Sequence, residues 1–313
     1  MIQIAIMGLG TVGTGVAKVV AENARQIERK LGEPLQVKTI LVRHFKDGPY
    51  RQLMTDDFTK IEEDHAIRVV VETIGGVEAA YKYTKRALNA GKHVVTANKQ
   101  LVAEKGAELL ALAKKRGVNY LFEASVGGGI PVLHPLTQCM VANRIDEVYG
   151  ILNGTTNYIL TRMVRAGTTF ADAPERGAGE GLCGGRPHRR RGGRRRRAED
   201  LYPGGSGLRL SGGPGGCAHG GDQPAVSPGR EDRPAGGLPR QAAGPGGAPA
   251  RRPYRLCGTP SDPGGSSPLA SVDDVFNAVV VRGNATGEVM FYGQGAGELP
   301  TASACVADVM EAL

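Results

Sequence analysis

The sequence predicts an α/β protein, with a Rossmann-type domain of parallel strands and helices followed by an α+β domain. Two observations predict the first domain: short runs rich in valine and isoleucine alternate with stretches of helical periodicity, and a glycine-rich turn follows the first run at once. A third concerns the second domain, whose middle is so rich in glycine, proline and arginine that no core is expected there. The expected boundaries are residues 1–130 for the Rossmann domain, 131–294 for the second domain, and 295–313 for a C-terminal helix.

The first strand and helix are joined by a glycine turn. Residues 2–7 form an apolar run, residues 8–13 read GLGTVG, and the valines that follow recur at helical spacing. Such a turn is tight, lets a phosphate approach bare backbone, and starts a helix whose N-terminus attracts a pyrophosphate. A glycine turn without a ligand is the alternative, but the position between a strand and a helix favours dinucleotide binding through Gly8, Gly10 and Gly13.

The second strand, expected at residues 37–42, ends in Arg43. A cofactor site that prefers NAD usually has an acidic residue here, which binds the ribose hydroxyls. An arginine can instead pair with the 2′-phosphate of NADP, so Arg43 favours NADP as the cofactor. NAD stays open, because an exposed arginine at a strand end is common and Asp47 lies close by in sequence.

Three further strands alternate with helices up to residue 131. The strands are expected at residues 68–73, 91–96 and 118–122, and the helices at residues 77–90 and 104–116. This alternation implies a parallel sheet with right-handed crossovers, in which ligands gather at the carboxyl ends of the strands. Thr73, Lys99 and the loop of residues 123–131 fall at those ends, and we expect Thr73 to contact the cofactor.

Lys99 is the ionisable side chain at this edge that is best placed to take part in chemistry. A lysine beside a nicotinamide can bind a carboxylate, or transfer a proton if burial and neighbouring charges lower its pKa. The alternative is a surface lysine at the start of the following helix. Position alone leaves both interpretations open.

The C-terminal residues predict two strands and a final helix. The strands are expected at residues 277–281 and 288–292, where β-branched and aromatic residues gather. Thr301 is the expected N-cap of the helix, since a threonine oxygen can accept a hydrogen bond from the free amides of the first turn.

Residues 176–268 differ in composition from both flanks. They hold 25 Gly, 13 Pro and 16 Arg, with a single valine and no isoleucine. Such a segment buries too little apolar surface to offset its ordering entropy, so a disordered or misformed region is expected. Its arginines raise the net charge of the chain to +8, but with only Tyr202 and Tyr254 to stack on bases, no specific nucleic-acid partner is expected.

The five cysteines are widely spaced and form no C-x-x-C pair. They indicate neither a disulfide framework nor a zinc site, and the spacing of the histidines and cysteines in the unusual tract matches no metal-ligand pattern. We therefore expect a protein of the reducing cytoplasm. No charged leader precedes the first apolar run, and no window of about 18 apolar residues occurs, so no membrane partner is expected.

With these residues in view, the chain resembles homoserine dehydrogenase over residues 1–173 and 267–313. Besides the glycine turn, the motifs that carry the resemblance are residues 72–76 (ETIGG), 94–99 (VVTANK), 123–131 (EASVGGGIP), 150–160 (GILNGTTNYIL), 276–279 (FNAV), 291–297 (FYGQGAG) and 300–304 (PTASA). Several motifs in one order are far more specific than any of them alone.

The resemblance implies interconversion of homoserine and aspartate semialdehyde with NADP or NAD, in the pathway to threonine, methionine and isoleucine. Hydride would pass between the nicotinamide and the alcohol carbon, while a side chain handles the hydroxyl proton. By match, Gly10, Thr11 and Val12 contact the cofactor, and Lys99 lies near both ligands as the catalytic lysine that this chain retains. The resemblance also implies that residues 131–294 are a substrate and dimerisation domain and that the helix of residues 295–313 packs back on the Rossmann domain. A homodimer is expected if the substrate domain folds.

The resemblance also implies a sodium ion, held by main-chain oxygens of the loop that follows the fifth expected strand. By match these oxygens belong to Glu123, Val126, Gly128 and Ile130. A glycine-rich hinge between the domains is the alternative interpretation of the same loop.

One signature of the family is missing. In homoserine dehydrogenases an acidic segment that follows the 150–160 motif orients the amino group of homoserine and ends in a lysine that donates the proton. The corresponding residues here, 181–194, read GLCGGRPHRRRGGR, and the last lysine of the chain is Lys115. A reading-frame slip between about Pro174 and Ser267 is the simplest hypothesis, because GC-rich codons read out of frame encode mostly Gly, Arg, Pro and Ala.

We therefore expect a chain of homoserine dehydrogenase descent in which cofactor binding survives better than catalysis. A non-catalytic NADP-binding remnant and a related amino-acid or semialdehyde dehydrogenase remain alternatives. The frame-slip hypothesis has a direct check in the coding DNA: another frame should encode Glu-x-Asp-Pro and a downstream lysine, and their absence from both other frames would refute it.

Overall fold

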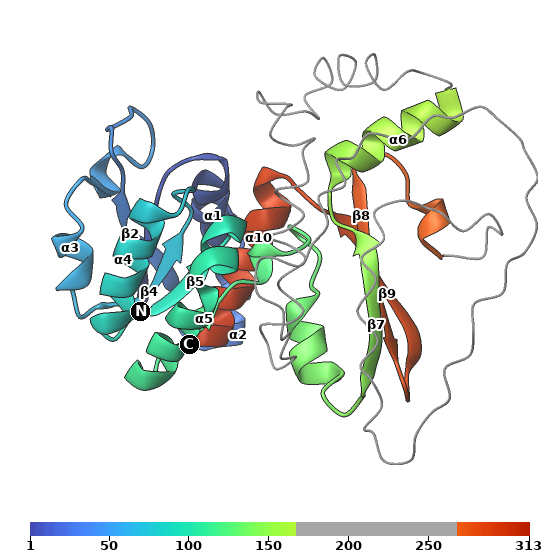
Figure 1. Cartoon of the computed structure of the whole chain (residues 1–313). Coiled ribbons are helices and arrows are strands. Elements are labelled where there is room, and N and C mark those ends of the chain that lie inside the picture. The colour runs from blue at the N-terminus through green and yellow to red at the C-terminus, as the bar shows by residue number, and fades with distance from the viewer. Residues whose placement is uncertain (167–267) are drawn as a thin grey trace, which may run out of the picture.

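The structure is a computed structural model that describes residues 1–166 and 268–313. The expectations for the tract rich in glycine, proline and arginine, including its lack of a core, fall on residues outside the described part. The described residues form two sheets, with the C-terminal helix near the boundary between them (Figure 1).

The larger sheet is wholly parallel and has the strand order β3-β2-β1-β4-β5-β6. Its strands are β1 (Ile2–Met7), β2 (Leu35–Leu41), β3 (Met54–Thr55), β4 (Ile67–Glu72), β5 (His93–Thr96) and β6 (Tyr120–Leu121). The chain runs outward from β1 to β3 and then returns to the other side of β1 with β4. This is the strand order of the Rossmann fold, so the predicted Rossmann-type domain is confirmed. Rossmann folds bind dinucleotides at the reversal of strand order next to β1.

Helices cover both faces of this sheet. They are α1 (Thr11–Glu22), α2 (Ala24–Leu31), α3 (Thr59–Glu62), α4 (Glu78–Asn89) and α5 (Lys99–Arg116), with α10 (Glu298–Ala312) from the C-terminus. Because side chains alternate along a strand, β1 points Ile4 and Ile6 toward α1, α2 and α10, and Ala5 and Met7 toward α3, α4 and α5. Both faces are thus buried, as an all-parallel sheet requires.

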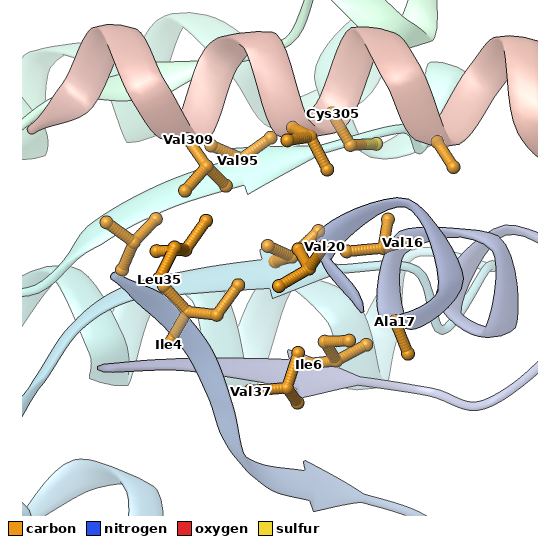
Figure 2. Close-up of a cluster of buried hydrophobic side chains, with 14 of the residues drawn as sticks. Ile4, Ile6, Val16, Ala17, Val20, Leu35, Val37, Val95, Cys305 and Val309 are labelled. Carbon is orange, nitrogen blue, oxygen red and sulfur yellow. The ribbon is translucent and has the colours of Figure 1, made fainter. Parts of the chain in front are cut away.

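The C-terminal helix completes one of these two cores. Cys305 and Val309 of α10 lie over Val16 and Val20 of α1 and over the sheet (Figure 2). The two helices come so close at Gly15 that a Cβ atom there would lie 2.7 Å from the carbonyl oxygen of Glu298. An ion pair of 2.6 Å between Lys18 and the Glu298 carboxylate lies beside this contact.

The second sheet is antiparallel and has the order β7-β8-β9. Its strands are β7 (Ile145–Ile151), β8 (Phe276–Gly283) and β9 (Gly287–Gln294), and helix α6 (Gly154–Ala166) follows β7. Four short helical turns complete the described elements: η1 (Arg51–Leu53), η2 (Glu123–Ser125), η3 (Pro135–Cys139) and η4 (Pro268–Ser271). One face of the sheet packs on the 130–140 segment and the other on η4.

Several element boundaries differ from those expected. The C-terminal helix begins at Glu298 with Gly297 as its N-cap, so the expected N-cap role of Thr301 is wrong. Pro300 follows in the first turn, where its missing N–H costs no hydrogen bond. Helix α5 begins at Lys99 instead of residue 104, because Asn98 caps it.

Within the two described ranges, no helix combines the length and apolarity that a membrane crossing requires.

We predict that Gly15→Ala destabilises the protein by about 1–3 kcal/mol, because the new methyl group would push α10 away from α1. Chemical denaturation followed by circular dichroism measures this. Glu22→Ala, at an exposed position of the same helix, should change the unfolding free energy by less than about 0.5 kcal/mol. Equal effects of the two substitutions would contradict the close packing of α10 on α1.

Candidate active site at the carboxyl edge of the parallel sheet

The β1–α1 turn is shaped by glycines that serve two different purposes. Gly8 has φ +97°, and a Cβ atom there would lie 3.0 Å from the carbonyl oxygen of Thr73. At Gly13 a Cβ atom would lie 2.0 Å from the carbonyl oxygen of Gly8, so these two glycines let the protein's own backbone approach itself. Gly10 has no atom within 4 Å of the same position. The open side of the turn is therefore at Gly10, where a ligand can reach the backbone.

The N-terminus of α1 presents its amides without a competing acid. Gly10 is the N-cap, no side chain caps the helix, and the first turn contains no acidic residue. Thr11 is exposed and Val12 half-buried at this end. Free amides and the positive end of the helix dipole suit a phosphate group, so these residues fit the pyrophosphate of a dinucleotide.

Thr73 supports this turn from the neighbouring strand end. Its hydroxyl lies 3.0 Å from the carbonyl oxygen of Met7 and 2.9 Å from that of Gly8, to which it donates. The structure thus brings Thr73 against the glycine turn, and its hydroxyl proton is used by the backbone. Cofactor contact through other atoms of Thr73 stays a prediction.

The carboxylate of Glu72 lies buried between the ends of β4 and β5. One oxygen accepts from the Ile74 amide at 2.7 Å, and the other accepts from the Thr96 hydroxyl at 2.6 Å. Burial raises the pKa of Glu72, while the hydrogen bonds from Thr96 and from the backbone of the turn act in the opposite direction. Sequence reasoning passed over Glu72 as part of a motif; the signal was an acid at the end of an apolar strand.

Lys99 is the first residue of α5, and Asn98 fixes the start of that helix. The Asn98 side chain accepts from the Leu101 amide at 3.1 Å and donates to the Gly76 carbonyl oxygen at 2.6 Å. Lys99 itself is half-buried. It lies at the carboxyl edge of β5, and the turn of residues 73–76 ends beside Asn98.

Arg43 lies just beyond β2, on the other side of β1 from Thr73 and Lys99. Its side chain is exposed. In the strand order of this sheet, the end of β2 is where a Rossmann fold meets the adenosine ribose. The predicted site residues therefore spread along one edge in the order Arg43, glycine turn, Thr73 and Lys99.

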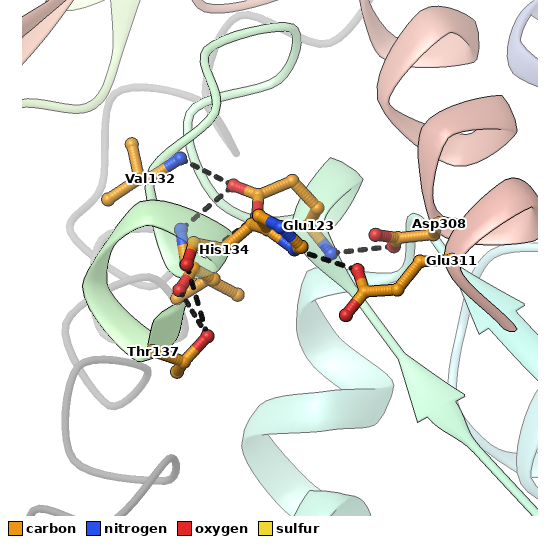
Figure 3. Close-up of polar contacts among 7 residues, drawn as sticks. Glu123, Val132, His134, Thr137, Asp308 and Glu311 are labelled. Atoms are coloured by element: carbon orange, nitrogen blue, oxygen red, sulfur yellow. Dashed lines mark hydrogen bonds and ion pairs between the residues drawn. The ribbon is translucent and has the colours of Figure 1, made fainter. Parts of the chain in front are cut away.

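The loop after β6 is held by the side chain of Glu123. This buried carboxylate accepts three backbone hydrogen bonds, from the amides of Val132 at 2.5 Å, Leu133 at 2.9 Å and His134 at 2.6 Å (Figure 3). The carboxylate is therefore committed to the loop. Glu123 could therefore contribute to the expected sodium site only through its main-chain oxygen, and the resemblance implies that donor type for all four residues.

Helix α10 anchors both ends of this loop. The Asp308 carboxylate accepts from the Glu123 amide at 2.9 Å, and the Glu311 carboxylate lies 2.8 Å from Nδ1 of His134 (Figure 3). Burial, with the nearby Glu123 and Glu311 charges, raises the pKa of Asp308 to about 8. Asp308 was not predicted from the sequence, because its partner is 185 residues away.

The carboxyl edge of the parallel sheet, as far as the structure describes it, offers groups that suit an anionic ligand. In the described ranges, no group of three or more His, Cys, Asp or Glu side chains is placed to hold a metal ion. The edge offers helix amides, a half-buried lysine and several carbonyl oxygens. Such a set can bind a phosphorylated cofactor and orient a polar substrate beside it.

Family comparisons match this arrangement. A model described as homoserine dehydrogenase, NAD binding domain, matches residues 8–123, and a second described as homoserine dehydrogenase matches residues 131–187 and 259–310. The chain belongs to the homoserine dehydrogenase family. The predicted resemblance is therefore confirmed, and with it the class of oxidoreductase and a binding domain for NAD(P). The second match leaves residues 188–258 uncovered, inside the tract of unusual composition.

Individual relatives agree with the family assignment. The homoserine dehydrogenase of Bacillus subtilis is 34% identical over 329 residues, covering 99% of this chain and 72% of that protein. The enzyme of Synechocystis is 37% identical with the same coverages. The crystal structure of a homoserine dehydrogenase from Thiobacillus denitrificans superposes with a TM-score of 0.77 at 28% identity, covering 99% of this chain and 73% of that one.

We predict that Glu123→Gln lowers the unfolding free energy by about 1–3 kcal/mol, because the glutamine NH2 group would face a backbone donor that now has an acceptor. Urea denaturation measures the change. Glu311→Gln is the control: its ion pair with His134 is partly exposed, so the loss should stay below about 1 kcal/mol. A control that loses as much as Glu123→Gln would argue against the special role of the three amides.

Proposed function

We propose that this chain binds NADP(H) at the carboxyl edge of the parallel sheet and converts homoserine far more slowly than its relatives. The observation that carries cofactor binding is the open backbone at Gly10, at the uncapped N-terminus of α1. Gly8, Thr11, Val12 and Gly13 complete the turn that would hold the pyrophosphate.

The residues of this edge have distinct proposed roles. A bound nicotinamide supplies the hydride acceptor or donor. Arg43 would bind the 2′-phosphate at the end of β2, and Thr73 would border the nicotinamide half. Lys99, at the end of β5, would bind or orient the substrate and exchange a proton with its hydroxyl group.

The proposal of weak catalysis rests on the sequence of residues 174–267. The segment that corresponds to the acidic signature of the family, residues 181–194, contains no acidic residue and no lysine, and no lysine follows Lys115. These residues lie outside the described part of the structure, so the argument is chemical. General acid–base groups commonly contribute about 10²-fold to 10⁴-fold to a rate.

We predict turnover at least about 10²-fold below that of the Bacillus subtilis relative assayed in parallel. The assay follows NADPH absorbance with homoserine and NADP, beside a fluorescence titration of NADPH binding. NADPH binding without detectable conversion of homoserine supports the proposal and also favours the alternative of a non-catalytic NADP-binding remnant. Turnover equal to that of the relative would refute weak catalysis, and activity with another amino alcohol in place of homoserine would favour the related-dehydrogenase alternative.

Arg43 should determine the choice between the two cofactors. We predict that Arg43→Ala weakens NADP binding by about tenfold, through loss of a charged hydrogen-bond donor, and leaves NAD binding unchanged. Isothermal titration with both cofactors measures this. Arg29→Ala, an exposed arginine of α2, serves as the control. A parallel loss for NADP and NAD would show that Arg43 does not contact the 2′-phosphate.

We propose further that a sodium ion is held by main-chain oxygens of Glu123, Val126, Gly128 and Ile130. Its attraction for these carbonyl oxygens would stabilise one conformation of the loop. Carbonyl oxygens are hard donors of the kind that such cations prefer, and Gly127 and Gly128 both have φ +67°, which curls the loop. We predict a higher melting temperature in sodium chloride than in choline chloride at equal ionic strength. Identical melting curves would contradict the ion site.

A homodimer and a cytoplasmic location complete the proposal. Support for dimerisation comes from β9, an edge strand of the described antiparallel sheet that exposes Met290 and Tyr292. Exposed apolar side chains on an edge strand favour association with another chain. Support for the location comes from the cysteine pattern.

A further inference from the structure

A chain of hydrogen bonds links the ends of β4 and β5 through a buried carboxylate. We propose that Glu72 is a positioning residue for the nicotinamide half of the cofactor, acting through Thr96 and Asn98. This inference deepens the proposed function and rests on it, because it assumes that the edge binds a dinucleotide.

The geometry of the chain is continuous. The Glu72 carboxylate accepts a hydrogen bond from the Thr96 hydroxyl at 2.6 Å, and the Thr96 hydroxyl oxygen in turn accepts one from the backbone N–H of Asn98 at 3.0 Å. Asn98 then caps α5 and donates to the carbonyl oxygen of Gly76. The second oxygen of Glu72 holds the Ile74 amide. One carboxylate thus sets both the 73–76 turn and the first residue of α5, Lys99.

The strand order indicates which half of the cofactor these two segments face. The pyrophosphate site follows β1, and the adenosine half lies toward β2, where Arg43 stands. The remaining half of a dinucleotide must extend the other way, over β4 and β5. Residues 73–76 follow β4 directly, and Lys99 follows β5 after Ala97 and Asn98. Both segments would therefore border the nicotinamide half and not the adenosine half.

Burial makes a purely space-filling role for Glu72 implausible on energetic grounds. Glu72 and Thr96 are both fully buried, among the valines of β4 and β5. A buried carboxylate is costly, and well-packed apolar residues often stabilise a core as well or better. What an apolar residue lacks here is the ability to fix two backbone turns in one geometry, which preorganises a site.

Thr96 offers a nearly isosteric test. Thr96→Val removes the hydroxyl and breaks the link, whereas Thr96→Ser keeps it. Thr84→Val is the matched control, because Thr84 of α4 is equally buried and its hydroxyl has no hydrogen-bond partner among the described residues. Each variant is titrated with NADPH and with 2′-phospho-ADP-ribose, which has the adenosine and pyrophosphate but no nicotinamide.

We expect Thr96→Val to weaken NADPH binding by about tenfold, equivalent to about 1.4 kcal/mol. The dissociation constant for 2′-phospho-ADP-ribose should stay within about twofold of that of the unsubstituted chain. Thr96→Ser should bind NADPH as tightly as the unsubstituted chain does, and Thr84→Val should change the affinity for neither ligand. If Thr96→Val does not fold, Glu72→Gln takes its place, since it keeps the shape but turns one acceptor into a donor.

The outcomes separate the two levels of the proposal. If Thr96→Val weakens the binding of both ligands equally, or does not weaken NADPH binding, the positioning role of Glu72 is overturned while the proposal of cofactor binding stands. Failure of the unsubstituted chain to bind either ligand overturns the proposed function, and this inference with it.

Discussion

The close packing of α10 on α1 is the contact on which the rest of the structure depends. The parallel sheet must be covered on both faces, and one face is completed only when the last residues of the chain return to it. Gly15 permits the approach, and the Cys305 and Val309 side chains fill the space above α1. Because α10 also accepts from the Glu123 amide through Asp308, the same packing fixes the loop after β6. Core and site are therefore joined through one helix.

Buried carboxylates organise the carboxyl edge of the sheet. Glu72 holds the ends of β4 and β5, Glu123 holds three consecutive amides, and Asp308 holds Glu123. Each accepts from backbone or hydroxyl donors, so the edge gains fixed geometry from groups that would be costly if left unpaired. Gly128 adds a contact to the segment before α10, since a Cβ atom there would lie 2.3 Å from the Gly295 carbonyl oxygen.

The parallel sheet and its glycine turn could be predicted because their signals are local. The strand expected at residues 68–73, observed at Ile67–Glu72, lies between stretches of helical periodicity, and the strand–glycine–helix order at residues 2–22 has few other meanings. The antiparallel strand β7 and the helix α2 were not predicted. Strand β7 does not alternate clearly between buried and exposed residues, and α2 is a short, mostly polar helix that buries only Ile27. Glu72 and Asp308 were missed as structural acids because their partners come from other strands and from the far end of the chain. The predicted roles of Arg43 and Lys99 follow from position and await measurement.

The central proposal is that all residues needed to bind the cofactor lie within 1–166 and 268–313. The most direct test replaces residues 167–267 by a flexible glycine–serine linker and measures NADPH affinity by fluorescence titration beside the full chain. The account predicts saturable binding with a dissociation constant within about threefold of the full chain. Loss of NADPH binding in a shortened chain that still unfolds cooperatively would contradict it.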